Sequence, residues 1–279
     1  MSKTVALALG TFDGIHKGHL AVLGSAIKSK AEKRVVVTFA APPMKVGAKL
    51  VMPESVKEKE FLKLGFDEIL LLDFEKVKDM SPTEFLDMIF EKYNVKSISC
   101  GFNYRFGKQA SGDTETLKEY ANSRGAECKI IDPVYYKGEP ISSTRIRSAV
   151  QNGDIESANE MLGFPFFLES KVISGDARGR KMGFPTANQI PDKDVVIPKF
   201  GVYKTETEID GKKYSSITNI GIRPTYKTET PIAETHIIGF SGDIYGKTMR
   251  VGFIRFIREE KKFSCLEEVR EQIEKDLAF

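Results

Sequence analysis

Apolar runs and amphipathic stretches alternate along the N-terminal half of the chain. Residues 5–9 are apolar, a polar loop with three glycines follows, and residues 16–30 have the spacing of an amphipathic helix. Residues 34–39 are rich in β-branched side chains, which favour a second buried strand. A strand, a helix and another strand within this short length predict a βαβ unit whose strands are parallel.

The alternation continues to the middle of the chain. It predicts helices and strands in turn, with helices at residues 56–66, 81–94 and 114–125 and strands at residues 67–74, 95–102 and 126–136. Ser81-Pro82 is typical of a helix start, and Gly125 of a helix end. We therefore expect an α/β Rossmann-like first domain, in which ligands bind at the carboxyl ends of the strands.

Shorter strand-like runs dominate the C-terminal half. Glycines, prolines and the hairpin signal Asp210-Gly211 separate these runs, which occupy residues 168–175, 200–209, 213–220, 231–240 and 248–258. Residues 264–279 have a helical pattern, with Ser264 as the cap and Glu267 completing a capping box. This half is expected to be a mainly antiparallel β-barrel domain with a C-terminal helix. The change of pattern predicts domains at residues 1–158 and 159–279.

Composition narrows the function classes. A chain of 279 residues, 41% hydrophobic and 29% charged, fits two globular domains, and its net charge of +3 predicts no nucleic-acid partner. The apolar runs are far shorter than the ~20 residues that span a bilayer, so we expect no membrane partner and no signal peptide. Cys100, Cys128 and Cys265 are too scattered for a disulfide framework or a metal knuckle. A cytoplasmic protein that acts on small molecules is expected, with its oligomeric state left open.

The loop GTFDGIHKGH at residues 10–19 is the first candidate site. Only three histidines occur in the chain, and His16 and His19 share one face of a first helical turn, where free backbone N–H groups also point. Gly10, Gly14 and Gly18 allow a ligand close to the backbone. The combination suits a phosphate that gains charge in a transition state. The spacing excludes a Walker loop or a GxGxxG fingerprint, and the alternative is a glycine-rich turn with two surface histidines.

The segment ISSTRIR at residues 141–147 is the second candidate. Ser142, Ser143 and Thr144 are three successive hydroxyls, and Arg145 and Arg147 add guanidinium groups, so the segment suits a polyphosphate clamp. The alternative is a helix cap followed by solvated arginines.

A third candidate is the glycine-rich stretch GDARGRKMGFPTAN at residues 175–188. Gly175, Gly179 and Gly183 let backbone N–H groups wrap phosphates, while Thr186 and Asn188 offer oxygen ligands to the Mg²⁺ of a nucleotide. From the residues alone, a glycine-rich barrel loop remains the alternative.

Together these motifs resemble the bifunctional bacterial riboflavin kinase/FAD synthetase family, whose first domain is the flavin-adenylating branch of the HxGH nucleotidyltransferases. GTFDGIHKGH is similar to the family's GxFDGxHxGH motif, ISSTRIR to its ISSTxIR motif, and residues 175–188 to its GxxxGRxxGFPTAN signature. NIGIRPT at residues 219–225 and the segment 234–246 agree with later family motifs. The resemblance covers essentially the whole chain, with the motifs in the family's order.

For the first domain, the resemblance implies an FMN adenylyltransferase that uses ATP. His16 and His19 would be catalytic, and the family's motifs imply nucleotide contacts from Gly10, Phe12, Gly14, Ser142, Ser143, Thr144 and Arg147. Its flavin-contacting segment maps onto Asn103, Arg105, Phe106 and Asp113. One departure is visible: residues 38–43 read TFAAPP where the family often has TFEPHP, so contacts from the missing acidic and histidine side chains are in doubt.

For the second domain, the resemblance implies a riboflavin kinase that uses ATP and Mg²⁺. The family's signature implies nucleotide contacts from Gly175, Gly179, Arg180, Gly183, Thr186 and Asn188, the last two also holding the metal. Glu234 would be the catalytic base and Arg270 a flavin contact. His236 lies on the same side of a strand as Glu234, where we expect an orienting role.

Two other functions compete with a riboflavin- and FMN-using enzyme. One keeps the HxGH chemistry with another acceptor, such as phosphopantetheine, nicotinamide mononucleotide or a cytidylyl substrate, and the GFPTAN segment argues against it. The other is a flavin-binding sensor or carrier. It is disfavoured because a module that only binds does not need His16, His19, Thr186, Asn188 and Glu234.

Overall fold

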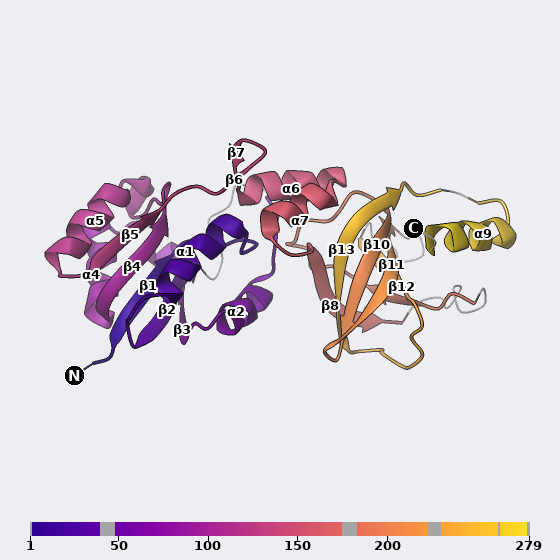
Figure 1. Cartoon of the computed structure of the whole chain (residues 1–279), viewed down its shortest axis with the longest axis horizontal. Coiled ribbons are helices and arrows are strands. Elements are labelled where there is room, and N and C mark those ends of the chain that lie inside the picture. The colour runs from indigo at the N-terminus through magenta and orange to yellow at the C-terminus, as the bar shows by residue number, and fades with distance from the viewer. Residues whose placement is uncertain (1, 40–47, 175–182, 223–229, 262, 278–279) are drawn as a thin grey trace. The chain divides into compact units, whose positions relative to one another are not determined.

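The computed structural model describes residues 2–39, 48–174, 183–222, 230–261 and 263–277. The chain divides into two compact units, Met1–Ser143 and Thr144–Phe279, each with its own sheet (Figure 1). The sequence pattern changes near residue 158, and between the two positions lie helix α6 (Ser143–Asn152) and the first half of α7 (Ile155–Leu162).

The N-terminal unit is built on a five-stranded sheet in the order β3-β2-β1-β4-β5, and all its strand pairs are parallel. Its strands are β1 (Thr4–Leu9), β2 (Lys33–Phe39), β3 (Glu68–Leu72), β4 (Asn94–Gly101) and β5 (Glu127–Ile131). Its helices are α1 (Lys17–Ile27), α2 (Glu54–Lys63), α3 (Phe74–Val77), α4 (Pro82–Lys92) and α5 (Thr114–Ser123), with a 3₁₀ turn at Lys108–Ala110. A two-stranded hairpin of β6 (Tyr135–Tyr136) and β7 (Glu139–Pro140) follows. The predicted α/β fold is confirmed.

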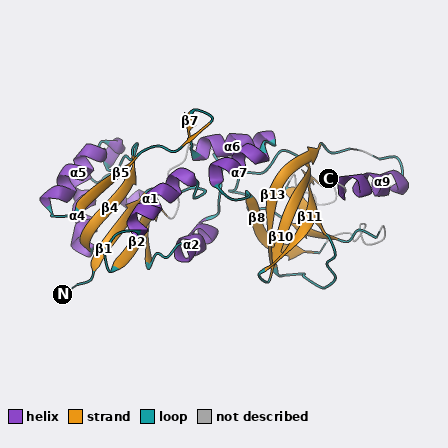
Figure 2. Ribbon diagram, viewed as in Figure 1, coloured by secondary structure: helices purple, strands orange, loops and turns teal. Residues whose placement is uncertain are grey.

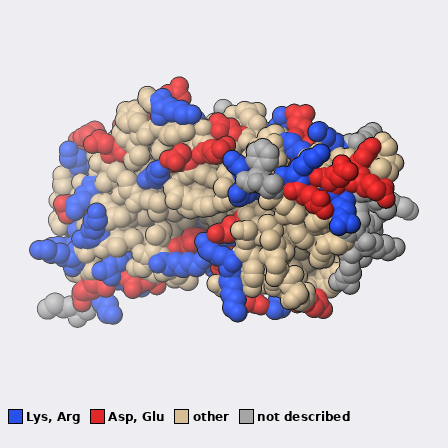
Figure 3. All heavy atoms as spheres, turned by 45° about the vertical axis from the view of Figure 1, so that its right-hand side comes forward, with Lys and Arg blue, Asp and Glu red and all other residues tan. Residues whose placement is uncertain are grey.

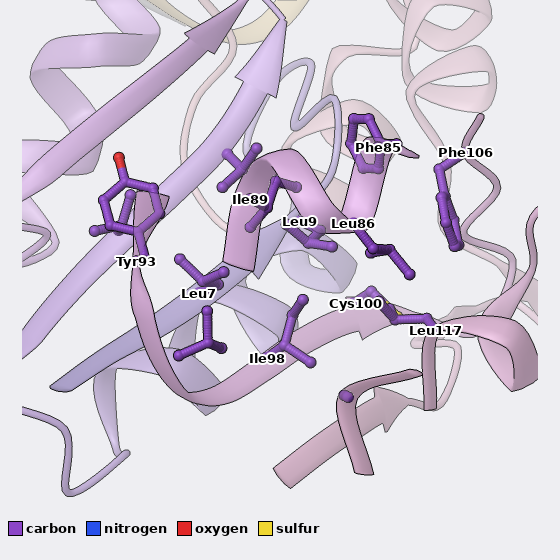
Figure 4. Packing of buried hydrophobic residues seen from close by; sticks show 14 of the residues in the cluster. Leu7, Leu9, Phe85, Leu86, Ile89, Tyr93, Ile98, Cys100, Phe106 and Leu117 are labelled. Atoms are coloured by element: carbon purple, nitrogen blue, oxygen red, sulfur yellow. The ribbon is translucent and has the colours of Figure 1, made fainter. Parts of the chain in front are cut away.

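Alternation along β4 separates the two faces of this sheet. Ser97 bonds to Ser29, just after α1, and Ser99 bonds to Ser25 in α1, with Oγ–Oγ distances of 2.8 and 3.0 Å. The other face carries the main apolar cluster, which Figure 4 shows between strands β1 and β4 and helix α4. The labelled members of this cluster are Leu7, Leu9, Phe85, Leu86, Ile89, Tyr93, Ile98, Cys100, Phe106 and Leu117. Helices therefore cover both faces, as parallel strands require.

The strand order creates a switch point between β1 and β4. The chain leaves β1 toward β2 on one side and leaves β4 toward β5 on the other. Both strands end at the same edge, so the loop after Leu9 and the segment after Gly101 begin side by side. This edge is where an open α/β sheet binds its ligands.

The C-terminal unit is a closed barrel in the order β10-β11-β12-β9-β8-β13 (Figure 2). Its strands are β8 (Phe167–Ile173), β9 (Thr186–Gln189), β10 (Gly201–Ile209), β11 (Lys212–Ile222), β12 (Pro231–Ile237) and β13 (Thr248–Arg258). The pairings within the barrel are antiparallel. The predicted β-barrel with a C-terminal helix is confirmed, and that helix is α9 (Leu266–Leu277).

Of two local predictions for this unit, the hairpin turn is confirmed, whereas the predicted capping-box glutamate of α9 is wrong. Asp210 and Gly211 form a two-residue turn with φ of 51° and 76°, the positive values that the Asp-Gly signal predicts for a hairpin. At α9 the N–H of Ser264 donates to the carboxylate of Glu268 (2.9 Å), whereas the sequence pattern favoured Glu267. Because the helix begins at Leu266, Glu268 is its third residue and has the reach of a capping-box carboxylate.

Buried hydroxyls link three strands inside the barrel. Thr218 is at the centre, with its Oγ1 2.9 Å from both Thr205 Oγ1 and Thr235 Oγ1. Ser216 joins Thr205 to Thr207, with Oγ–Oγ1 distances of 2.8 and 2.7 Å. All five side chains are at most 2% exposed. Their polar groups satisfy one another, so the interior carries a hydrogen-bonded ladder across β10, β11 and β12.

None of the helices in the described ranges is long and apolar enough to cross a membrane. On the face drawn in Figure 3, basic and acidic side chains are interspersed.

Candidate active sites

A buried aspartate holds the loop between β1 and α1. Asp13 is 5% exposed, and its Oδ1 accepts hydrogen bonds from the N–H groups of Val51 (2.8 Å) and Met52 (3.4 Å). The backbone here takes left-handed values, with φ of 84° at Gly14 and 45° at Ile15. A Cβ at Gly14 would lie 2.7 Å from the Val51 side chain, so glycine is required by both conformation and space.

His16 and His19 form a stacked pair at the start of α1. Their ring centroids are 3.5 Å apart, and His16 Nδ1 accepts from the N–H of His19 (3.2 Å) while capping the helix. Because Nδ1 is an acceptor, the neutral ring of His16 carries its proton on Nε2 and can donate to a ligand. The side chain is only 5% exposed, which does not fit the alternative of two surface histidines.

The imidazoles are uncharged at neutral pH. Burial lowers the pKa of His16 to about 4. Burial also lowers the pKa of His19, and electrostatic interactions with His16 and Lys57 lower it further. The site therefore offers neutral N–H donors, together with the free backbone N–H groups of the helix end, to an anion.

Phe12 packs against the histidine pair through its contact with His19. Its ring lies 5.4 Å from the His19 ring and 5.8 Å from the Phe61 ring, measured between centroids, and the residue is 1% exposed. A Cβ at Gly10 would come within 2.9 Å of the Phe12 ring, which explains glycine at that position. A nucleotide contact from Phe12 would therefore come from its backbone.

The second motif joins the loop through one hydroxyl. Ser143 Oγ donates to the carbonyl oxygen of Asp13 (2.9 Å), which brings the start of ISSTRIR to the histidine loop. Thr144 and Arg147 belong to the other compact unit, where Arg147 Nη2 donates to Thr144 Oγ1 (3.0 Å). The structure therefore places Ser143, and the adjoining Ser142, beside the first motif.

Phe106 and Asp113, expected to contact flavin, have structural partners. Phe106 is 6% exposed and its ring lies 5.6 Å from the rings of both Tyr104 and Phe85. Asp113 caps α5 by accepting from the N–H of Thr116 (3.0 Å). Both side chains shape the segment that follows β4.

Asn103 and Arg105 are exposed in that same segment. Arg105 Nη1 lies 3.7 Å from Asp113 Oδ2. Phe102, which we did not single out from the sequence, is 45% exposed directly after β4, at the switch point. The available signal was an aromatic residue at the end of a strand, residues 95–102, that was predicted to end at a ligand edge.

The end of the third motif, residues 175–188, lies on β9, which pairs with the strand β12 that carries Glu234. In the register of β9 and β12, Asn188 lies opposite Glu234 and Thr186 opposite His236. Asn219 of β11 lies opposite Glu234 on its other side. These side chains therefore share one face of the sheet.

The oxygen donors on this face fit a hard cation. Asn188 is 6% exposed, and its Oδ1 is buried with no hydrogen-bond partner among the residues that the structure describes. A buried carbonyl oxygen of this kind, opposite a carboxylate and with a threonine on the same face, suits Mg²⁺. Within the described ranges, no group of three or more His, Cys, Asp or Glu side chains is arranged to hold a metal ion. A metal here would depend on the amide and hydroxyl oxygens and on its nucleotide.

Two family models match the chain, one on each site. The FAD synthetase model matches residues 1–145, and the riboflavin kinase model matches residues 162–279. A bifunctional riboflavin kinase/FMN adenylyltransferase of Bacillus subtilis is 35% identical over 97% of this chain and 89% of its own length.

The chain belongs to the bifunctional riboflavin kinase/FMN adenylyltransferase family.

Other relatives agree over nearly the whole length. A bifunctional riboflavin kinase/FMN adenylyltransferase of Escherichia coli K12 is 31% identical over 97% of this chain and 90% of its own. A crystal structure named macrolide-efflux protein, from Streptococcus pneumoniae, has a TM-score of 0.87 and 33% identity, covering 99% of this chain and 93% of that one. The bifunctional riboflavin kinase/FMN adenylyltransferase family thus accounts for both halves of the chain.

His236 has a positioning contact in the family's kinase half. Its Nδ1 is 2.9 Å from the carbonyl oxygen of Pro185, and its ring stands edge-on to Phe184 with centroids 5.5 Å apart. Since a carbonyl only accepts, Nδ1 carries the proton. This bond fixes the chain where it enters β9, next to Gly183 with φ of 86°.

Of the remaining residues expected in the kinase site, only some lie in the described part of the structure. Arg270 is exposed on α9, and its Nε lies 3.2 Å from Glu274 Oε1. Gly175, Gly179 and Arg180 lie outside the described residues, as do Ala40–Pro43 of the TFAAPP departure.

Lys57 is a buried lysine near the histidine loop that could not be recognised from the sequence. It is 1% exposed on α2, and its Nζ donates to the carbonyl oxygen of Thr11 (3.1 Å) in the histidine loop. In the sequence it stands among alternating lysines and glutamates, a pattern typical of a solvated helix face. Only the tertiary fold distinguishes it from its neighbours.

Proposed function

We propose that this chain makes FMN and FAD in two steps, each with its own ATP. The C-terminal unit phosphorylates riboflavin at its ribityl 5′-hydroxyl, and the N-terminal unit adenylylates FMN and releases pyrophosphate. One observation carries the proposal: each family-model match contains a partly buried polar constellation suited to its own phosphate chemistry. The stacked His16–His19 pair lies in the first match, and the Asn188–Glu234 pair in the second.

In the kinase step, Glu234 accepts the proton of the ribityl hydroxyl while the hydroxyl oxygen bonds to the γ-phosphorus of ATP and ADP leaves. General-base assistance of this kind is typically worth ~10²–10⁴-fold. Asn188 Oδ1 and Thr186 Oγ1 would hold Mg²⁺, which when bound neutralises triphosphate charge. His236 keeps β9 in place through Pro185, so the oxygen donors stay aligned with Glu234.

In the adenylyl transfer, an oxygen of the FMN phosphate attacks the α-phosphorus of ATP, and the bond to the β-phosphate oxygen breaks. The nucleophile is already anionic, so no protein base is needed. The imidazole N–H groups of His16 and His19 stabilise the charge that develops on the α-phosphate and the leaving pyrophosphate. Ser142, Ser143, Thr144 and Arg147 are proposed to hold the β- and γ-phosphates. The two flavin-segment side chains exposed after β4, Asn103 and Arg105, are proposed to face FMN.

A chromatographic assay of the full chain with riboflavin, ATP and Mg²⁺ tests the proposal. We expect FMN to appear first and FAD to follow, with ADP and pyrophosphate as the other products. Unchanged riboflavin that co-elutes with the protein would support a flavin carrier instead. A complete lack of flavin products, with FMN also unused, would point to another acceptor for the HxGH chemistry.

We place this enzyme in the cytoplasm, a reducing compartment in which its three free thiols, Cys100, Cys128 and Cys265, stay reduced. Its partners are the small-molecule substrates of the two reactions.

A further inference from the structure

Lys57 lies behind the histidine loop and contacts it directly. Its ammonium group donates to the carbonyl oxygen of Thr11, which also accepts from Thr38 Oγ1 (3.1 Å). One turn further along α2, Phe61 packs its ring against Phe12. The same helix face therefore fixes two consecutive residues of the loop where its left-handed backbone begins, with φ of 50° at Phe12.

Lys57 is paired with an acidic side chain in a buried place. Its counter-ion is Glu54, whose Oε2 lies 2.8 Å from Nζ, and the lysine side chain is 2% exposed against 21% for the glutamate. Removing an ammonium group from water is costly, and an apolar side chain of similar size often packs as well or better. A buried lysine at this position therefore has a role that an apolar anchor would not serve.

The groups around His19 identify that role. His16 stacks on it, Lys57 approaches from α2 with Glu54 as its partner, and Asp13 lies in the intervening loop. After burial and the neighbouring imidazole, the positive charge of Lys57 is the next cause that lowers the pKa of His19. His19 Nδ1 is buried with no hydrogen-bond partner in the described part of the chain. A fixed positive charge behind the pair favours an anion in front of it and keeps the ring neutral.

We infer that Lys57 is a positioning residue for adenylyl transfer, which fixes the loop backbone at Thr11 and supplies a permanent positive charge behind His16 and His19. This inference rests on the function proposed above. Lys57 itself is buried beneath the loop and acts through the imidazoles and the backbone. The fit is to the triphosphate of a nucleotide, whose negative charge increases at the leaving pyrophosphate during transfer.

The test compares Lys57→Met, which keeps length without charge, with Lys57→Arg, which keeps charge and a donor. FAD formation from supplied FMN should lose about 10²-fold in kcat in Lys57→Met, with a smaller change in the KM for ATP. Lys57→Arg should recover at least tenfold of this loss. Riboflavin phosphorylation by the same samples should stay at the wild-type rate, because that site lies in the other unit.

A second readout separates charge from mere packing. The chain has only three histidines, so their ring signals can be assigned and titrated by NMR. The titration midpoint of His19 should rise in Lys57→Met, because the positive charge no longer opposes protonation. In Glu54→Gln it should fall, because the counter-charge is gone. If Lys57→Met fails to fold, Glu54→Gln alone decides.

Two results would overturn the inference: wild-type kcat for FAD formation in a folded Lys57→Met variant, or a His19 midpoint that moves in none of the variants. If the wild-type chain forms no FAD from FMN, the proposed adenylyl transfer fails instead. The NMR midpoints then still report whether Lys57 controls the protonation of His19.

Discussion

Burial of His16 links the stability of the N-terminal unit to pH. The folded pKa of about 4 lies below the usual 6.5, so between these values the unfolded chain binds a proton that the folded chain does not. Stability from this group is present above pH 6.5 and is lost as pH falls toward 4, by up to about 3 kcal/mol. Denaturant unfolding from pH 7 to pH 4.5 should show the decline, and His16→Gln should make it shallower, with the remaining slope coming from His19. An equal pH slope in both proteins would contradict the assignment.

The same two histidines should affect only one reaction. Each of His16→Ala and His19→Ala removes a preorganised donor to the transition state, which typically costs ~3 kcal/mol or ~10²-fold in rate. FAD formation from supplied FMN should fall accordingly, while FMN formation from riboflavin continues. Equal losses in both reactions would mean that the histidines maintain the fold and do not stabilise the α-phosphate.

Glu234 should show the reverse pattern. Glu234→Gln keeps the size and hydrogen-bonding reach of the side chain but removes the proton acceptor, so riboflavin phosphorylation should fall by roughly 10²-fold or more. FAD formation from FMN should remain near normal. Glu208→Gln, on β10 of the same barrel, is the matched control and should phosphorylate riboflavin normally. Wild-type phosphorylation by Glu234→Gln would exclude this carboxylate as the base.

At the scale of elements, the hydroxyl ladder inside the barrel ties β10, β11 and β12 together. Thr218→Val keeps the side-chain shape but leaves the buried hydroxyls of Thr205 and Thr235 each without one partner. An unsatisfied buried polar group costs about 1–3 kcal/mol, so the barrel should unfold at clearly lower denaturant. Thr248→Val, exposed on β13, is the control. Equal midpoints for both variants would show that the ladder contributes no stability.

Elements with a regular pattern were predictable, and short polar ones were not. The apolar period of β1 and β2 and the Asp210-Gly211 turn follow from side-chain alternation and backbone preference. Strand β9 escaped prediction because its four residues, TANQ, are mostly polar: Asn188 faces the site, while Gln189 donates inside the barrel to the carbonyl oxygens of Ser170 and Met249. No local pattern distinguishes such a strand from a loop.

In the candidate sites, too, some residues were predictable from the sequence and others were not. The motif residues carried their own signal through glycine spacing and paired histidines. The pairing of Asn188 with Glu234 depends on strand register, and the burial of Lys57 depends on how α2 packs. Both are tertiary facts, which a single sequence does not encode in its local spacing.

At the scale of the whole molecule, two compact units each have their own sheet and their own site. Helix α7 packs with the barrel: Asn159 Nδ2 donates to the carbonyl oxygen of Phe253, and Asn159 Oδ1 accepts from the N–H of Phe166. The functional division at residues 1–158 and 159–279 remains a prediction. Independence of the two reactions is the central claim.

One measurement tests that claim most directly: a time course of FMN and FAD from riboflavin, ATP and Mg²⁺ with Glu234→Gln, His16→Ala and their equimolar mixture. We predict that Glu234→Gln forms neither product at an appreciable rate, that His16→Ala accumulates FMN, and that the mixture forms FAD. FMN released by one variant then serves the other. Loss of both activities in either folded variant, or FAD formed from riboflavin by Glu234→Gln at the wild-type rate, would contradict two independent sites.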